Sequence, residues 1–173
     1  KSTNLAVSGA TMSTNKDNSI YEQATKIKSD LIIVQGTDDD WTNDINIGTD
    51  KTDTKTFYGA FYSAITKIKS NNPNSKIIVM TPTKQCYIKD GKTVRKDTTK
   101  NDLGHTLADY VDVQIDACNE LDIPVYDAYH STQFKPNIPS YRKSSMPDGV
   151  HPNEKGHEVI MYELIKNFYG FYG

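Results

Sequence analysis

The sequence has little cysteine, almost no net charge and no long hydrophobic run. No window approaches the roughly 20 apolar residues of a membrane-spanning helix, and no signal peptide is recognisable. The formal net charge is −2 with acidic and basic residues interspersed, so no basic face for nucleic acid is indicated. We therefore expect neither a membrane span nor nucleic-acid binding. Because the sequence begins at Lys1, it leaves the cellular compartment open.

Cysteine motifs that bind metal ions and glycine-rich loops that bind phosphate groups are also missing. Cys86 and Cys118 lie far apart in the sequence without a CxxC pattern, so both are expected to be unpaired. Neither GxxxxGK[ST] nor GxGxxG, the glycine-rich loops that bind phosphate groups, occurs. The sequence predicts no cofactor.

Short apolar runs alternate with segments of helical spacing. The runs are rich in Ile and Val and are predicted to be buried strands: residues 4–9, 31–36, 76–82 and 123–129. Helices are predicted near residues 20–27, 57–68, 107–121 and 160–168. This alternation predicts a single α/β domain over residues 1–173, in which helices cover both faces of a mostly parallel sheet. Functional residues in such folds gather at the carboxyl ends of the strands.

Two long loops are expected near that edge of the sheet. Residues 83–102 contain Asp90-Gly91 between two short extended stretches, which is typical of a tight β-hairpin. Residues 130–147 are polar and contain three prolines. Either loop could border a substrate cleft or be a solvated insertion, and the sequence favours neither interpretation.

An aspartate precedes a histidine by three residues in the stretch Asp148-Gly-Val-His151, just before the last helical segment. A carboxylate at this spacing can reach Nδ1 of the imidazole and stabilise the imidazolium that forms when Nε2 takes a proton. His151 is therefore a candidate general base and Asp148 the residue that orients it. A capping aspartate beside a surface histidine would give the same tetrapeptide, so support has to come from other segments.

Two glycines at predicted strand ends provide this support. Gly9 ends the first apolar run, and Gly36 ends the second, shortly before the acidic residues 38–40. Glycine lets the backbone approach a ligand closely, so that its N–H groups can donate to a developing negative charge. Together with residues 148–157, these segments resemble the sequence blocks of the SGNH hydrolases, also called GDSL esterases and lipases.

The resemblance implies a flavodoxin-like three-layer α/β/α sandwich and a Ser-His-Asp triad that needs no metal or cofactor. It assigns the general base to His151, its orientation to Asp148, and the oxyanion hole to the Gly9 N–H and the side chain at position 38, here Asp38. The expected substrate contacts are Gly36, Asp39 and Trp41. Short acyl esters, lipids and acetylated sugars are candidate substrates. Acetylated carbohydrate is preferred because the loop regions are polar and contain tyrosine.

The family's first block, Gly-Asp-Ser, does not occur in the sequence. It carries the nucleophile at the end of the first strand, which lies between the next two strands in the flavodoxin-like order 2-1-3-4-5. Without it, main-chain groups in the middle of the sheet would have no partners. We therefore expect a further strand, from an upstream segment or from another chain. The serines nearest the expected site lack a nucleophile-elbow context: Ser8, Ser13, Ser144 and Ser145.

Asp38 stands where the family has asparagine. An amide donates to the oxyanion, whereas an ionised carboxylate repels it. Three hypotheses follow: Asp38 is protonated, another donor such as Asn43 replaces it, or the protein is not a competent hydrolase.

Two alternatives come from other classes of function. Asp38, Asp39 and Asp40 could bind Mg²⁺ or Ca²⁺ for phosphoryl chemistry. The chain could also be a non-catalytic carbohydrate-binding module, in which Trp41 and the tyrosines stack on sugar rings. The other histidines show no partner in the sequence and are not expected to be catalytic: His105, His130 and His157.

Overall fold

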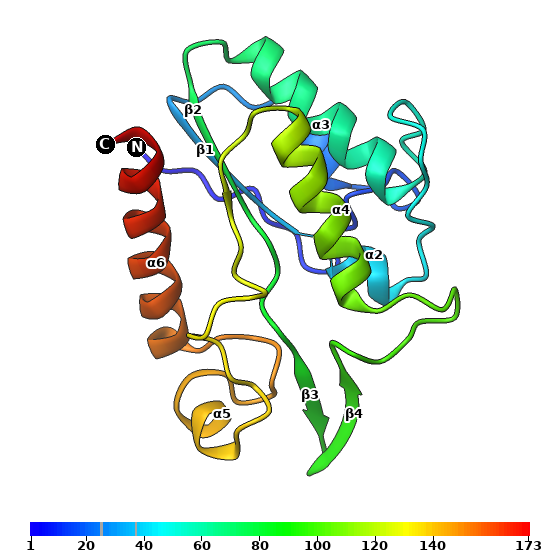
Figure 1. Cartoon of the computed structure of the whole chain (residues 1–173), viewed down its shortest axis with the longest axis vertical. Coiled ribbons are helices and arrows are strands. Elements are labelled where there is room, and N and C mark those ends of the chain that lie inside the picture. The colour runs from blue at the N-terminus through cyan, green and yellow to red at the C-terminus, as the bar shows by residue number, and fades with distance from the viewer. Residues whose placement is uncertain (25, 37) are drawn as a thin grey trace.

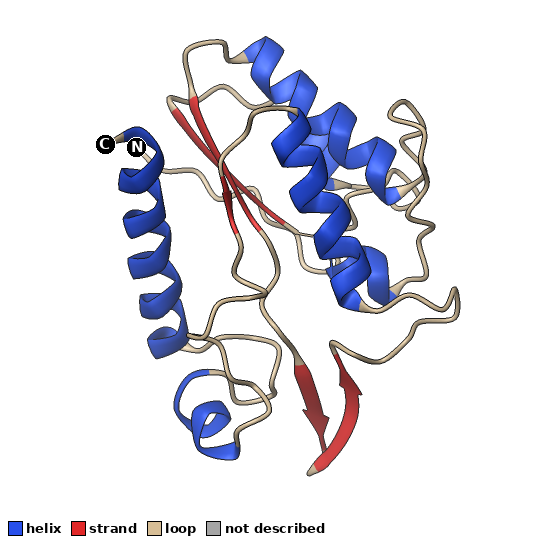
Figure 2. Cartoon of the chain, viewed as in Figure 1, coloured by secondary structure: helices blue, strands red, loops and turns tan. Residues whose placement is uncertain are grey.

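The computed structural model describes residues 1–24, 26–36 and 38–173 as a mixed α/β chain. Three strands form a parallel sheet in the order β1 (Leu31–Gln35), β2 (Lys76–Met80) and β5 (Val125–Tyr126). Ile33 of β1 is in register with Ile78 of β2. Three of the four predicted strands are thereby confirmed (Figure 2). Among the described residues, no helix is long and apolar enough to cross a membrane.

Helices cover both faces of this sheet (Figure 1). On one face, α3 (Phe57–Asn71) and α4 (Leu107–Glu120) pack on the side chains of Ile77 and Val79. On the other face, α6 (Glu154–Tyr172) packs on Ile78 and Met80, the intervening residues of the same strand. Successive side chains of a strand point to opposite faces, so β2 contributes to two cores. This is the three-layer α/β/α arrangement that the sequence predicts.

Three shorter helices of the described chain lie in the segments before and between the strands and the long helices. The helix α1 (Ile20–Ala24) packs against α3, and α5 (Pro139–Ser145) packs against α6. The helix α2 (Asp38–Thr42) follows the carboxyl end of β1 and contains the acidic residues expected at the site. The predicted long loop 130–147 thus contains a helix of its own.

The predicted hairpin is present as β3 (Cys86–Lys89) and β4 (Lys92–Lys96), which pair antiparallel. Its turn residues Asp90 and Gly91 have φ values of 51° and 73°, the left-handed conformation that a tight hairpin turn requires. In Figure 1 the hairpin and α5 lie beyond the carboxyl ends of the sheet strands. The loop between β2 and α4 therefore stands at the edge where a site is expected.

The predicted strand at residues 4–9 is wrong, because these residues form no strand in the structure and Leu5 and Val7 are exposed. A strand needs a neighbour, and within the described residues β1 pairs with β2 alone. The other edge of β1 is open. Its side chains Leu31 and Ile33 are 43% and 51% exposed, although they share a sheet face with the buried Ile78. The open edge agrees with the expected further strand but does not identify it.

Candidate active site

The turn before α6 brings Asp148 and His151 into direct contact. Nδ1 of His151 lies 2.6 Å from Oδ2 of Asp148. Oδ1 of Asp148 accepts the backbone N–H groups of Val150 and His151 at 2.9 and 2.8 Å. The helix then begins with Asn153 as its N-cap, whose side chain accepts the Gly156 N–H at 3.1 Å. Asp148 and His151, called the dyad below, are therefore joined by hydrogen bonds within the turn. The turn leads directly into the capped helix α6.

The histidine of this dyad faces solvent. The His151 side chain is 80% exposed, which leaves Nε2 free to receive a proton from a group that approaches the site. Partial burial would raise the pKa of Asp148, but hydrogen bonds from the His151 ring and from the His151 and Val150 N–H groups hold that pKa below its ordinary value. Asp148 is thus kept ionised, the state that stabilises an imidazolium.

The hairpin fixes the position of this turn. The Cys86 N–H donates to the Gly149 carbonyl at 2.9 Å, and the Ile88 N–H donates to the Asp148 carbonyl at 2.8 Å. Gly149 has φ 79°, and a Cβ there would lie 1.8 Å from the Cys86 carbonyl oxygen. Because nothing larger than a hydrogen atom fits, the Asp-Gly-Val-His turn requires glycine at its second position.

Asp38 receives a hydrogen bond from the residue just before β3. Nε2 of Gln85 donates to Oδ2 of Asp38 at 2.8 Å, and Nη2 of Arg95 donates to Oε1 of Gln85 at 3.4 Å. The Arg95 guanidinium lies over the Trp41 ring, 4.9 Å from its centroid. A chain of contacts therefore runs from β4 through Gln85 to the start of α2.

Asp39 connects the acidic segment to the dyad electrostatically. Burial and the neighbouring Asp38 carboxylate raise the pKa of Asp39, while the charges of Lys16, His151 and Arg95 act in the opposite direction. The geometric link is the start of β3, where Gln85 donates to Asp38 of α2 and the next residue, Cys86, donates to the Gly149 carbonyl of the histidine turn. The structure thus brings together two of the three segments that the sequence singles out.

Asp40 links α2 to the third segment. Its buried carboxylate accepts the N–H groups of Met12 and Ser13 at 2.5 and 3.1 Å. Burial raises the pKa of Asp40 to about 6, against the lowering effect of these hydrogen bonds. The loop after Gly9 is therefore attached to α2 through one carboxylate.

The sequence model of the GDSL-like Lipase/Acylhydrolase family matches residues 1–159. The chain belongs to this family. One solved structure is 28% identical, with a TM-score of 0.85 over 94% of this chain and 76% of that chain. A protein from Lactobacillus plantarum is 24% identical, with a TM-score of 0.85 over 98% and 81%. A "possible lipase" from Chitinophaga pinensis is 21% identical, with a TM-score of 0.75 over 94% and 80%. A comparison with curated proteins found no match.

The glycines expected in the GDSL site both have unusual backbone conformations. Gly9 has φ 74°, in a turn where the Ala10 N–H donates to the Val7 carbonyl at 3.1 Å. Gly36 has φ 156°, and a Cβ there would lie 2.4 Å from the Ile20 side chain. Thr37, between Gly36 and Asp38, lies outside the described residues. The backbone at both positions is shaped for glycine, while their oxyanion and substrate contacts stay predictions.

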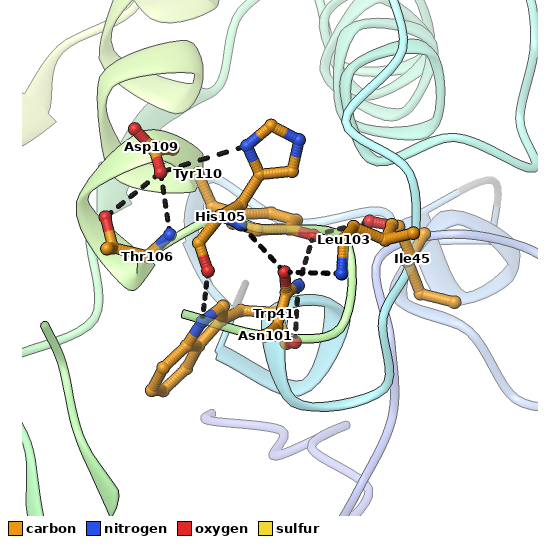
Figure 3. Close-up of polar contacts among 8 residues, drawn as sticks. All are labelled: Trp41, Ile45, Asn101, Leu103, His105, Thr106, Asp109 and Tyr110. Atoms are coloured by element: carbon orange, nitrogen blue, oxygen red, sulfur yellow. Dashed lines mark hydrogen bonds and ion pairs between the residues drawn. The ribbon is translucent and has the colours of Figure 1, made fainter. Parts of the chain in front are cut away.

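The prediction that Trp41 contacts substrate through its ring is corrected. The residue is 1% exposed, and its Nε1 donates to the His105 carbonyl at 3.1 Å (Figure 3). Asn101 continues this network by donating to the Trp41 carbonyl and to the Tyr110 hydroxyl at 3.0 and 3.2 Å. Trp41 is therefore a core residue that joins α2 to the loop before α4 and supports Arg95. A buried ring offers no surface for stacking on a sugar.

The three acidic residues of the alternative metal site face different partners. Asp38 contacts Gln85, Asp40 binds the Met12 and Ser13 backbone, and Asp39 stands between them in sequence. Over residues 1–24, 26–36 and 38–173, no group of three or more metal-ligating side chains is found. Asp38 and Asp40 are therefore engaged by different parts of the chain, which does not favour the phosphoryl-transfer alternative.

The serines expected as weak substitutes are not activated by the dyad. Ser13 and Ser145 are buried, and the Ser145 and Ser144 hydroxyls contact each other at 2.9 Å. In the part of the chain that the structure describes, no serine hydroxyl is hydrogen-bonded to the His151 ring.

Sequence reasoning missed a second dyad and the partner of Asp38. Nδ1 of His130 lies 2.7 Å from Oδ2 of Asp127, just after β5. No partner for His130 was identified in the sequence, although the Asp-x-x-His spacing of Asp127 and His130 was the available signal. Gln85 and Arg95 carried no such signal, because Gln85 reaches Asp38, and Arg95 reaches Gln85, only once the hairpin has folded.

Proposed function

We propose that the chain is the part of a serine ester hydrolase that supplies the general base. The observation that carries this proposal is the 2.6 Å contact between His151 Nδ1 and Asp148 Oδ2 on a turn fixed by β3. Family membership supports hydrolysis as the general chemistry, and the exposed Nε2 supports His151 as the proton acceptor.

In this mechanism His151 Nε2 removes the proton of a serine hydroxyl as the serine oxygen attacks the ester carbonyl. The Asp148 carboxylate stabilises the imidazolium through Nδ1. When the tetrahedral intermediate collapses, His151 returns the proton to the alcohol that leaves, and an acyl-serine remains. Water then attacks the acyl-serine with the same histidine as base, which releases the acid and regenerates the serine.

The serine is proposed to arrive on a strand that pairs with the open edge of β1. That edge presents unpaired main-chain groups together with the exposed Leu31 and Ile33 side chains. A strand parallel to β1 would pair with the main-chain groups, and its apolar side chains on the same face would pack beside Leu31 and Ile33. Its carboxyl end would lie beside Gly36 and α2, because parallel strands end at the same edge. Gln85 and Cys86 join α2 to the turn that carries His151.

The proposed substrate is an ester of a short acyl group, such as an acetylated carbohydrate. The segment next to the dyad turn carries charged and amide side chains that contact one another, namely Asp38, Gln85 and Arg95. Such polar groups suit a hydroxylated alcohol part better than a long acyl chain, which needs a continuous apolar wall.

Hydrolysis of 4-nitrophenyl acetate and of acetylated oligosaccharides by the intact protein tests the proposal. His151→Ala is expected to lower kcat/KM by at least about 10³-fold, because the residue is both base and acid in the cycle. His130→Ala is the matched control, since His130 also follows its aspartate by three residues and contacts it through Nδ1, and it is expected to keep the wild-type rate. Equal rates in wild type and His151→Ala would contradict the proposal.

A further inference from the structure

We infer that the side-chain amide of Gln85 donates the oxyanion hydrogen bond that the asparagine of other GDSL hydrolases provides. Gln85 would then be a catalytic residue, with Asp38 and Arg95 as its positioning residues. This inference rests on the proposed ester hydrolysis.

Gln85 adjoins two segments of the candidate site. The next residue, Cys86, donates its N–H to Gly149 at 2.9 Å, so Gln85 directly adjoins the turn that carries Asp148 and His151. Its side chain reaches the start of α2, where Nε2 lies 2.8 Å from Asp38 Oδ2. The Gln85 amide thus contacts Asp38, the residue that stands where the family has asparagine.

A primary amide has two N–H donors, and Asp38 takes one of them. The second N–H of Gln85 has no partner among the hydrogen bonds of the described residues. Asp38 therefore does not have to donate to the oxyanion. It accepts a hydrogen bond instead and holds the amide that can donate.

The orientation of the Gln85 amide is determined by its two neighbours. Arg95 Nη2 donates to Oε1, while Nε2 donates to Asp38. Rotating the amide by half a turn would place its carbonyl oxygen against the Asp38 carboxylate and its N–H₂ against the guanidinium. The side chain is only 3% exposed, so packing restricts it further and only a small part of the amide can meet a substrate. A donor fixed before the reaction needs little reorganisation in the transition state.

The positive charge of Arg95 offsets the repulsion expected between a carboxylate at position 38 and the oxyanion. The guanidinium and the Asp38 carboxylate flank the same amide from opposite ends, so their charges balance across Gln85. Nε of Arg95 is buried without a hydrogen-bond partner in the described chain, and none of the ion pairs found there includes Arg95. The positive charge is therefore available to offset Asp38.

The replacement expected from the sequence, Asn43, is engaged elsewhere. Its Nδ2 donates to the Asp39 carbonyl at 2.6 Å and to the Thr42 hydroxyl at 3.4 Å, and its Oδ1 accepts from Lys16. Both N–H groups of this amide thus have partners. Gln85 keeps a free donor.

The test compares Gln85→Leu, Asp38→Asn and the double variant in the intact protein, with an acetate ester as substrate. Loss of one oxyanion donor is expected to lower kcat of Gln85→Leu by about 10²–10³-fold, with KM within a few-fold of wild type. In the double variant, the amide introduced at position 38 supplies an N–H₂ close to the lost donor, so at least a tenfold recovery of kcat is expected. Thermal unfolding of each variant shows whether the fold is intact.

Two results would overturn the role of Gln85 while the proposed function stands. One is a Gln85→Leu variant with the wild-type kcat. The other is a loss of kcat that Asp38→Asn does not recover, which would make Gln85 a structural link between the hairpin and α2. An intact protein that is as inactive as its His151→Ala variant would overturn the proposed function itself, and the role of Gln85 with it.

Discussion

Asp148 contacts His151 through both of its carboxylate oxygens. Oδ1 accepts the His151 backbone N–H at 2.8 Å, and Oδ2 lies 2.6 Å from Nδ1 of the ring. One side chain therefore fixes the turn and the imidazole together. The backbone of β3 in turn holds this unit through hydrogen bonds to the Gly149 and Asp148 carbonyls.

Asp148→Asn is expected to lower kcat by about 10⁴-fold, as seen when the carboxylate of a serine-hydrolase triad becomes an amide. The amide N–H₂ would face Nδ1 and favour the tautomer in which Nε2 carries the proton and cannot accept one. Steady-state kinetics of ester hydrolysis measure the effect. Asp127→Asn is the matched control, because Asp127 contacts His130 in the same way at 2.7 Å, and it is expected to keep the wild-type kcat. Similar losses in the two variants would speak against a special role of Asp148.

Gly149→Ala is expected to destabilise the protein and to lower its activity. The residue has φ 79°, and its Cβ would overlap the Cys86 carbonyl oxygen at 1.8 Å. The left-handed backbone alone costs about 1–2 kcal/mol for a residue with a Cβ, and the overlap adds to it. Gly104→Ala shares the positive φ, 85°, but meets nothing within 4 Å, so it should lose stability without losing activity. Denaturant unfolding and kcat of both variants separate the two effects.

Asp40 is expected to make stability depend on pH between about 4 and about 6. Burial raises its pKa from 3.8 to about 6 in the folded protein, so the folded state binds more protons than the unfolded state in this window. Stability from this group is therefore present below pH 4 and is lost as the pH rises to 6, by up to about 3 kcal/mol. Asp148 acts in the opposite sense, because its lowered pKa removes stability as the pH falls.

Urea unfolding of wild type and Asp40→Asn across this range isolates the Asp40 contribution. The difference in the free energy of unfolding between the two proteins should change steadily from pH 4 to pH 6 and level off above it. A constant difference at all pH values would mean that the folded protein does not raise the pKa of Asp40.

The open edge of β1 is expected to be covered in the active protein. Alternate residues of a parallel edge strand direct their N–H groups away from the sheet, so residues 1–173 alone should show alternating fast and slow amide exchange along Leu31–Gln35. In the intact active protein, all of these amides should exchange slowly because a further strand pairs with them. Persistent fast exchange at the outward amides would show that no further strand pairs with β1, and would contradict the proposed position of the serine.

Much of the fold could be predicted from the sequence because its signals are local. Apolar periodicity identified α3, α4 and α6, and Asp90-Gly91 identified the hairpin turn. Residues 4–9 show the limit of such signals. Their composition suits a strand, but β structure also needs a partner, which the described chain does not provide there.

In the candidate site, too, the local contacts could be predicted from the sequence and the long-range contacts could not. Asp148 and His151 are three residues apart, so their contact could be predicted from one tetrapeptide. Gln85 and Asp38 are far apart in the sequence and meet because the hairpin folds across α2. Trp41 appeared suited to stacking on a ligand because it follows an acidic cluster, but its burial depends on the loop at 101–105, which no pattern placed against it.

Labelling with a fluorophosphonate, which modifies activated serines, tests the base role of His151 most directly. Mass spectrometry of the intact protein is expected to show one adduct on one serine. The adduct should be lost in His151→Ala and retained in His130→Ala. No adduct on the wild-type protein, or equal labelling of both variants, would contradict the account.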